Sequence, residues 1–190
     1  MKQDFSSAKE FWLQYTHALY ATPRAWAHKG ENLIHAFEAV AGASVESSMH
    51  LNMNDQAFML AGMAIEVQLK AILTNMEHIR TIVTVSKCPK EKDASIIWKV
   101  FFSHNLLELA KLAKINLSQE HENVAIALTQ YIYWRGRYVV PTERGIDDFI
   151  PVVLDTGLIG QAHSVATVES ARELLKHIID AVKTHLYSQS

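Results

Sequence analysis

The chain has 190 residues, of which 49% are apolar and 20% are charged, and its formal net charge at pH 7 is −2. This balance is typical of a globular domain that is large enough to bury a substantial core. The charge gives no general attraction to nucleic acid or to an anionic membrane, so binding to RNA would require a local basic patch. We expect one domain over residues 1–190 and no membrane partner.

Cysteine usage and the N-terminal sequence bear on the compartment. Cys88 is the only cysteine, which excludes an internal disulfide and fits a reducing compartment. The first residues, MKQDFSSAKEFW, lack the apolar segment of a signal peptide. No stretch reaches the roughly 20 uncharged apolar residues that are needed to cross a bilayer. We therefore expect a cytoplasmic protein.

Two helical segments are predicted before residue 50. Ser7 and Glu10 have the spacing of a capping box and indicate a first helix, which Pro23 interrupts. A second helix is expected over residues 29–41, with its end at the turn that begins at Gly42.

The segment over residues 54–76, NDQAFMLAGMAIEVQLKAILTNM, is the most informative part of the chain. Its first residue is a favourable N-cap, and the helix is expected to continue toward Arg80. A helix that is apolar almost all the way round is usually the buried centre of a bundle. Glu66 and Lys70 lie one turn apart with the acid first, so they face each other and pair. This charged pair either fixes the helix register, with Arg137 as a third member, or lines a polar cleft.

Three further segments follow. Residues 96–102, IIWKVFF, fit a strand or a helical turn equally well. Asn105 and Glu108 have capping-box spacing and open the next helix. Ser118 caps another helix, which is expected to end near Trp134.

The last fifty residues divide into a loop and a helix. Residues 138–160 hold two prolines and three glycines and predict a long irregular connection, a type of loop that is often functional. The last helix is expected over residues 167–186, and His185 is placed on its apolar face, in the core or at an interface. The other residues of that face are Ala171, Leu174, Leu175, Ile178, Ala181 and Val182. The pattern predicts an all-α, up-and-down bundle of four or five helices.

Two short motifs and the order of the segments carry a resemblance. The pattern A-x-E-x-x-L-K-A-x-L occurs in the central helix, at Ala64, Glu66, Leu69, Lys70, Ala71 and Leu73. The pattern H-x-L-x-x-L occurs at the next helix start, at His104, Leu106 and Leu109. Together with an arginine-rich helix end and an amphipathic last helix, they resemble the HEPN domain superfamily. The resemblance spans about residues 54–187 and leaves residues 1–50 as an N-terminal helical extension packed on that core.

The resemblance implies a helical bundle that is commonly a homodimer. Many members of the superfamily are ribonucleases, toxins paired with a nucleotidyltransferase-like antitoxin, or effectors of defence against phage, and others are inactive scaffold modules. Active members carry an arginine, four to six residues and then a histidine, and cleave RNA without a metal or another cofactor. The histidine acts as acid and base, and the arginine stabilises the charge on the phosphorus centre.

The Arg/His spacing of the superfamily occurs once here, from Arg172 to His177, and a chain of this composition contains about one such match by chance. Five residues along a helix leave two side chains roughly 140° apart, so this pair is expected to diverge. It is either a solvated helix face or a site that takes one residue from each chain of a dimer. The catalytic candidates are Arg137, Arg172, His177 and His104. For His104, at a helix start, capping or packing is the alternative to acid–base catalysis.

Three arginines follow the helix that ends near residue 134, among several aromatic residues. Guanidinium groups bind phosphate oxygens and aromatic rings stack on bases, so the segment is suited to RNA or a nucleotide. Its candidate binding residues are Arg135, Arg137, Arg144, Tyr138 and Trp134. The alternative is that the aromatic rings fill the end of the bundle while the arginines pair with Asp147, Asp148 or Asp155. No histidine or cysteine motif predicts a metal site.

Three functions remain in view. The first is a HEPN-like protein that contacts RNA or a nucleotide, as a metal-independent ribonuclease of a toxin or phage-defence system with an antitoxin or operon partner. The second is a catalytically inactive HEPN-like interaction or scaffold module. The third is a helical structural protein that oligomerises through its last helix.

Overall fold

The computed structural model describes residues 22–46, 50–85, 98–135, 151–153, 159–161 and 166–187. Over these residues the protein is a helical bundle with one short β ladder, which confirms the predicted all-α class. The helix predicted to begin at Ser7 lies outside the described residues.

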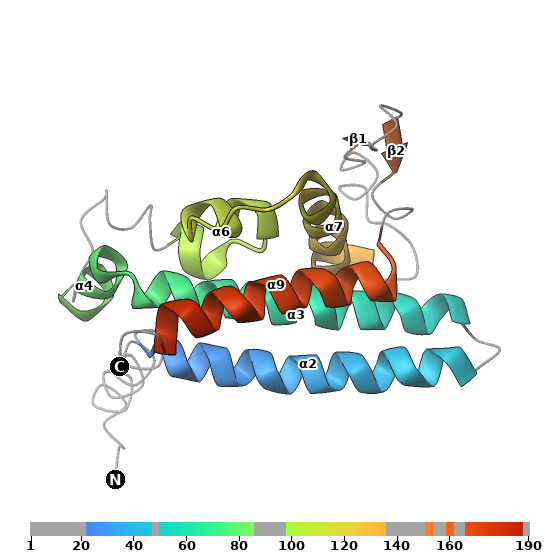
Figure 1. Ribbon diagram of the computed structural model, residues 1–190, viewed down its shortest axis with the longest axis horizontal. Helices are drawn as coiled ribbons and strands as arrows, with labels where there is room; N and C mark the ends of the chain where they lie inside the picture. Colours follow the sequence, from blue (N-terminus) through green and yellow to red (C-terminus); the bar gives the residue numbers. More distant parts are fainter. Residues whose placement is uncertain are drawn as a thin grey trace, which may run out of the picture.

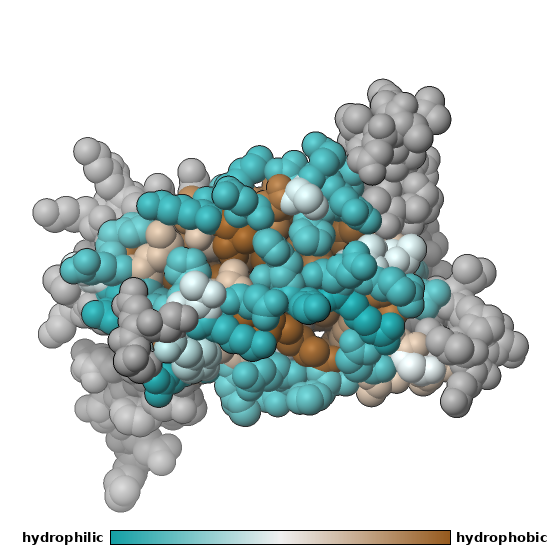
Figure 2. Space-filling model, in the orientation of Figure 1, coloured by the Kyte–Doolittle hydropathy of each residue, from teal (hydrophilic) through white to brown (hydrophobic). Residues whose placement is uncertain are grey.

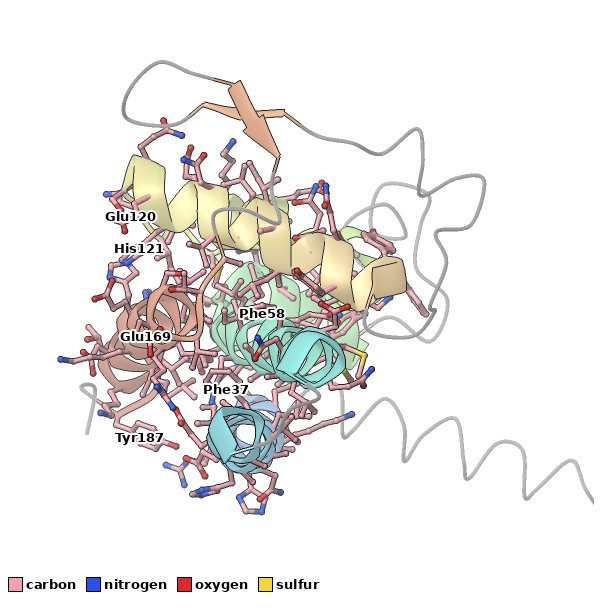
Figure 3. The ribbon with its side chains drawn as sticks, turned by 90° about the vertical axis from the view of Figure 1, so that its right-hand side faces the viewer. Phe37, Phe58, Glu120, His121, Glu169 and Tyr187 are labelled. Atoms are coloured by element: carbon pink, nitrogen blue, oxygen red, sulfur yellow. The ribbon has the colours of Figure 1, made fainter. Side chains whose placement is uncertain are left out.

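Three long helices form the body of the bundle (Figure 1). α2 (Pro23–Glu46) and α3 (His50–Asn75) run antiparallel, and α9 (Val168–Tyr187) lies against both of them in the same direction as α3. The view along these helices shows α3 between α2 on one side and α7 on the other, with α9 beside it (Figure 3). α3 is therefore the hub on which the other helices pack.

Small residues on α3 let the neighbouring helices approach closely. Ala57, Ala61 and Ala64 are fully buried, and Gly62 lies among them. A Cβ atom at Gly62 would stand 2.9 Å from Cγ1 of Ile132, so this position admits only glycine without a shift of its neighbour. Residues 64–74 of α3 are buried on every side, which explains why this part of the sequence shows no polar face.

The observed bounds of α2 differ from the prediction. Pro23 starts this helix. Proline is well tolerated there, because the N–H that it lacks would have no hydrogen-bond partner in the first turn. The predicted end at Gly42 is wrong, since α2 continues to Glu46. A glycine inside a helix costs about 1 kcal/mol relative to alanine, which packing against α3 can offset.

The start and end of α3 also differ from the prediction. The helix begins at His50, before the expected N-cap Asn54, and it ends at Asn75. A bend at Met76 separates it from α4 (Glu77–Val85), so the expected continuation toward residue 80 is a second helix. Within the run IIWKVFF, residues 98–102 form a helical turn, the π-helix η1 (Trp98–Phe102), and residues 96–97 lie outside the described residues.

The two predicted caps in the middle of the chain are confirmed. Asn105 precedes α6 (Leu106–Leu112), and its side-chain oxygen accepts a hydrogen bond from a backbone N–H three residues on, at 3.1 Å. Ser118 does the same for α7 (Gln119–Gln130) at 3.2 Å. α7 crosses the long helices and continues into the π-helix η2 (Tyr131–Arg135).

The connection before the last helix contains a two-stranded antiparallel ladder of β1 (Pro151–Val153) and β2 (Ile159–Gln161). α9 then buries most of its predicted apolar face, namely Ala171, Leu174, Leu175, Ile178 and Val182. His185 does not lie in the core, because this residue is exposed, and the interface position expected as the alternative stays a prediction. Its backbone carbonyl accepts a hydrogen bond from the Asn75 side chain at 2.9 Å, which joins the ends of α3 and α9.

One helix in the described part of the chain, Asn54–Asn75, is long and apolar enough by composition to cross a membrane. The rest of the protein buries 83% of its most apolar window. That degree of burial is what the core helix of a soluble bundle shows.

Candidate functional site

The charged pair on α3 is formed and is buried. Lys70 Nζ lies 2.5 Å from Glu66 Oε1, and the two side chains are 3% and 9% exposed. Pairing one helical turn apart is the geometry that the spacing predicts. A pair this deep loses its hydration, so each group needs further partners to be stable.

Lys70 finds its further partners on η1 and α2. Its Nζ donates a second hydrogen bond to the backbone carbonyl of Phe101, at 3.0 Å. The same ammonium lies 5.9 Å from the ring centre of Trp26, within reach of a cation–π attraction. The rings of Trp26 and Phe101 stack at 6.0 Å, so these two aromatic residues close one side of the charged pair. Arg137, the expected third member of the pair, lies outside the described residues.

The second carboxylate oxygen of Glu66 contacts a residue other than Lys70. Its Oε2 lies 2.9 Å from Nδ1 of His104. The His104 side chain is 41% exposed, so a single carboxylate links a buried ammonium to a ring that reaches the solvent. The three residues Glu66, Lys70 and His104 are called the charged triad below.

The position of His104 is fixed by the loop that leads into α6. The next residue, Asn105, caps α6, and the N–H of Leu106 donates to Thr129 Oγ1 on α7, at 3.1 Å. On its other side His104 meets the edge of Tyr133 from η2, with ring centres 5.5 Å apart. Tyr133 itself is 51% exposed. An exposed aromatic ring therefore stands directly beside the partly exposed histidine.

This arrangement is chemically suited to proton transfer. When neutral His104 donates its Nδ1–H to the carboxylate, Nε2 carries the free lone pair and is the atom able to accept a proton. Glu66 thereby sets both the tautomer and the orientation of the ring, and Lys70 holds the carboxylate in place. Capping, the alternative expected for His104, is carried out by Asn105 instead.

The predicted RNA-binding residues lie at the edge of the described structure or beyond it. η2 includes Trp134 and Arg135, whose side chains are not described. Arg137, Tyr138 and Arg144 lie outside the described residues. The chain nevertheless runs from Tyr133, beside His104, directly into this arginine-rich segment.

Arg172 is bound to α2. Its guanidinium forms a two-pronged ion pair with Glu38, with Nε at 3.0 Å and Nη2 at 2.6 Å from the carboxylate oxygens. The Arg172 hydrogen bond holds the pKa of Glu38 below its ordinary value of 4.5, although partial burial acts in the opposite direction. Arg172 also lies 3.6 Å from Glu169.

His177 faces a different neighbour. Its Nε2 lies 3.1 Å from the backbone carbonyl of Asn116, and its ring centre is 5.0 Å from that of His121 at the start of α7. Figure 3 shows His121 at this contact between α7 and α9. Burial, followed by the charge of His177, lowers the pKa of His121 below 6.5. Arg172 and His177 thus contact different elements, and one protomer does not bring them together.

Sequence reasoning missed Trp26, the Phe101 carbonyl and the link from His104 to Glu66. No spacing rule connects residues that are 31 or 38 positions apart. Within the described ranges, no group of three or more histidine, cysteine, aspartate or glutamate residues is placed to hold a metal ion.

No family model, curated protein or solved structure matches this chain.

Proposed function

We propose that this is a HEPN-like helical protein that contacts RNA through the face that carries His104, and that it cleaves RNA without a metal. The observation that carries the proposal is the 2.9 Å contact that orients an exposed imidazole on a buried carboxylate. This supports a proton-transfer role better than a packing role, because 41% of the His104 side chain is exposed.

The proposed reaction is attack of a ribose 2′-oxygen on the adjacent phosphorus atom. His104 Nε2 takes the 2′-hydroxyl proton, the 2′-oxygen forms a bond to phosphorus, and the bond from phosphorus to the 5′-oxygen breaks. The departing 5′-oxygen takes a proton from solvent water, protonated His104 returns its proton to the solvent, and the products are a 2′,3′-cyclic phosphate and a 5′-hydroxyl. Arg135, Arg137 and Arg144 are proposed to neutralise the phosphate charge, and Tyr133 to stack on a base together with Trp134 and Tyr138.

The second candidate is a catalytically inactive HEPN-like interaction module. One observation favours it: Arg172 and His177 carry the Arg/His spacing of the superfamily, yet Arg172 is tied to Glu38 and His177 to Asn116. A homodimer, an antitoxin or operon partner, and a cytoplasmic location belong to both candidates. A purely structural role, with oligomers formed through α9, is the third.

An RNA-cleavage assay in EDTA separates the candidates. Purified protein is incubated with a mixed RNA pool, and the assay is repeated with His104→Ala, Arg137→Ala and His177→Ala. We expect cleavage by the wild type and by His177→Ala, and loss of cleavage in the other two variants. His35→Ala, at an exposed position on α2, is the matched control.

Two outcomes contradict the ribonuclease, and a third contradicts only the role of His104. Cleavage that survives His104→Ala removes His104 from the chemistry. Absence of cleavage by the wild type, together with RNA binding that weakens as salt rises, leaves the interaction module with a nucleic-acid ligand. Absence of both cleavage and binding leaves the structural role.

A further inference from the structure

A pair of histidines joins α7 to α9 and shares no residue with the charged triad. His121 lies in the first turn of α7, and its ring centre is 5.0 Å from that of His177 on α9. Its side chain is directed from α7 toward α9 (Figure 3). Both residues are half-buried, and the surface over α9 is largely hydrophilic (Figure 2). Water and dissolved ions therefore reach this pair.

The hydrogen bond of His177 determines which of its nitrogen atoms is free. Nε2 lies 3.1 Å from the backbone carbonyl of Asn116, which only accepts hydrogen bonds, so Nε2 carries the proton. In the neutral ring Nδ1 then keeps its lone pair. Histidines that bind metal ions generally donate their other N–H in this way, to a backbone carbonyl or a carboxylate. His177 therefore has the tautomer and the fixed ring of a metal ligand.

The separation of the two rings matches that of two imidazoles on one ion. Zn–N bonds are about 2.0–2.1 Å long, so each ring centre lies about 3.2 Å from the ion. Tetrahedral bonds diverge by about 109°, which places the two ring centres roughly 5 Å apart. The observed separation of His121 and His177 is 5.0 Å, and their planes are tilted by 42° instead of being stacked face to face. The helices thus need not move for both rings to reach one ion.

The charges around the pair favour a cation. Burial and the charge of His177 lower the pKa of His121, which keeps this ring neutral at pH 7, the form that binds metal ions. The carboxylates of Glu120 and Glu173 act in the opposite direction on the same pKa, so their charges reach the ring. Glu120 precedes His121 in the chain, and Glu173 lies one helical turn before His177. Two acidic groups thus attract a positive ion to the pair.

We infer that His121 and His177 together bind one divalent transition-metal ion of the zinc class between α7 and α9. Imidazole nitrogen is a preferred ligand of such ions, whereas magnesium and calcium prefer oxygen ligands. The described ranges contain no group of three or more histidine, cysteine, aspartate or glutamate side chains that could share an ion, so water fills the remaining coordination positions. The ion holds the start of α7 against α9, and α7 continues into η2, which carries Tyr133.

The test uses zinc chloride as the probe and magnesium chloride as the control. Each salt is titrated into the metal-free full chain while the imidazole resonances of His121 and His177 are followed by NMR. We expect saturable shifts of both rings with zinc, with Nδ1 of His177 as the coordinating atom, and no shift with magnesium. No saturable shift with zinc, a shift of only one ring, or an equal response to magnesium would overturn the inference.

Two single variants test whether the rings act together. His121→Gln and His177→Gln each remove one ligand, and zinc should bind the remaining ring at least about tenfold more weakly, since loss of even an outer partner of a metal site costs about 10–100-fold. His35→Gln, at an exposed position on α2, should leave the zinc affinity unchanged. Equal zinc affinity in wild type and His177→Gln would overturn the inference.

Thermal unfolding provides a second readout of the same site. An ion that binds only the folded state raises the unfolding temperature as its concentration increases. Zinc should therefore raise the unfolding temperature of the wild type more than that of His121→Gln or His177→Gln, and an equal rise in all three proteins would contradict a shared ion. RNA cleavage is measured in EDTA, which removes zinc, so the proposed function can fail independently.

Discussion

Nδ1 of His104 lies 2.9 Å from Oε2 of Glu66, while the other oxygen of the same carboxylate is occupied by Lys70. The carboxylate therefore has a buried side and a side that faces an exposed ring. The buried side holds the ion pair with Lys70, and the other side holds the ring of His104. Removing Glu66 should consequently affect both stability and chemistry.

Replacement of Glu66 by leucine should lower the free energy of unfolding by about 3–5 kcal/mol. The substitution leaves the Lys70 ammonium buried without its anion, and uncompensated buried charges have costs of this size. The midpoint of urea unfolding at pH 7 measures the effect. An unchanged midpoint would show that Lys70 reaches the solvent in solution, contrary to its 3% exposure.

The double variant Glu66→Leu/Lys70→Met is the control for that measurement. An apolar pair of similar volume removes both charges together, so most of the lost stability should return. His104 loses its carboxylate partner in the double variant, and RNA cleavage should remain absent although stability recovers. Recovery of cleavage as well would show that Glu66 has no role in orienting His104.

The ion pair of Glu38 with Arg172 should contribute stability that depends on pH. Arg172 lowers the pKa of Glu38, so this contribution is fully present above the unfolded value of about 4.5 and is lost as the pH falls through the folded pKa. Both side chains are more than 40% exposed, which limits the contribution to about 0.2–1 kcal/mol. Urea unfolding of wild type and Arg172→Gln should differ by this amount at pH 7, and the difference should shrink as the pH falls below 4.5 and Glu38 becomes protonated. A difference that does not shrink as Glu38 is protonated would contradict the assignment.

The contact of His121 with His177 should make the protein less stable in mild acid. Burial and the neighbouring His177 charge lower the pKa of His121 in the folded state, so the unfolded chain binds this proton more readily. Stability should therefore fall as the pH drops below about 6.5, until the folded His121 is itself protonated. His121→Gln should flatten this dependence between pH 8 and 5, whereas His35→Gln, at an exposed position, should leave it unchanged. Equal slopes in wild type and His121→Gln would exclude the contact as the cause.

Local signals in the sequence predicted the parts of the fold that depend on local chemistry. Asn105 and Ser118 cap their helices as predicted. A cap joins a side-chain oxygen to the backbone N–H three residues later, so the sequence alone shows where it can form. The Glu66–Lys70 pair followed from helical spacing in the same way. The end of α2 was misplaced at Gly42 because packing on α3, a tertiary effect, outweighs the weak helix propensity of glycine.

The candidate site depends on contacts that spacing does not encode. Trp26 comes from α2, Glu66 from α3 and His104 from the loop before α6, and only the folded bundle brings them together. The spacing motif of Arg172 and His177 does not form one site. Arg172 contacts Glu38 on α2, whereas His177 contacts Asn116. The angle between two side chains on one helix follows from their spacing in the sequence. Which side chains of different helices meet depends on how the helices pack, and the spacing does not give this.

The tautomer of His104 tests the charged triad most directly. A long-range ¹H–¹⁵N correlation spectrum, recorded at a pH at which the ring is neutral, distinguishes a protonated Nδ1 from a protonated Nε2. The contact with Glu66 predicts the proton on Nδ1 in the wild type and loss of that preference in Glu66→Leu/Lys70→Met. A wild-type ring that carries its proton mainly on Nε2, as free imidazole side chains do, would contradict the Glu66–His104 hydrogen bond and the role in proton transfer that is built on it.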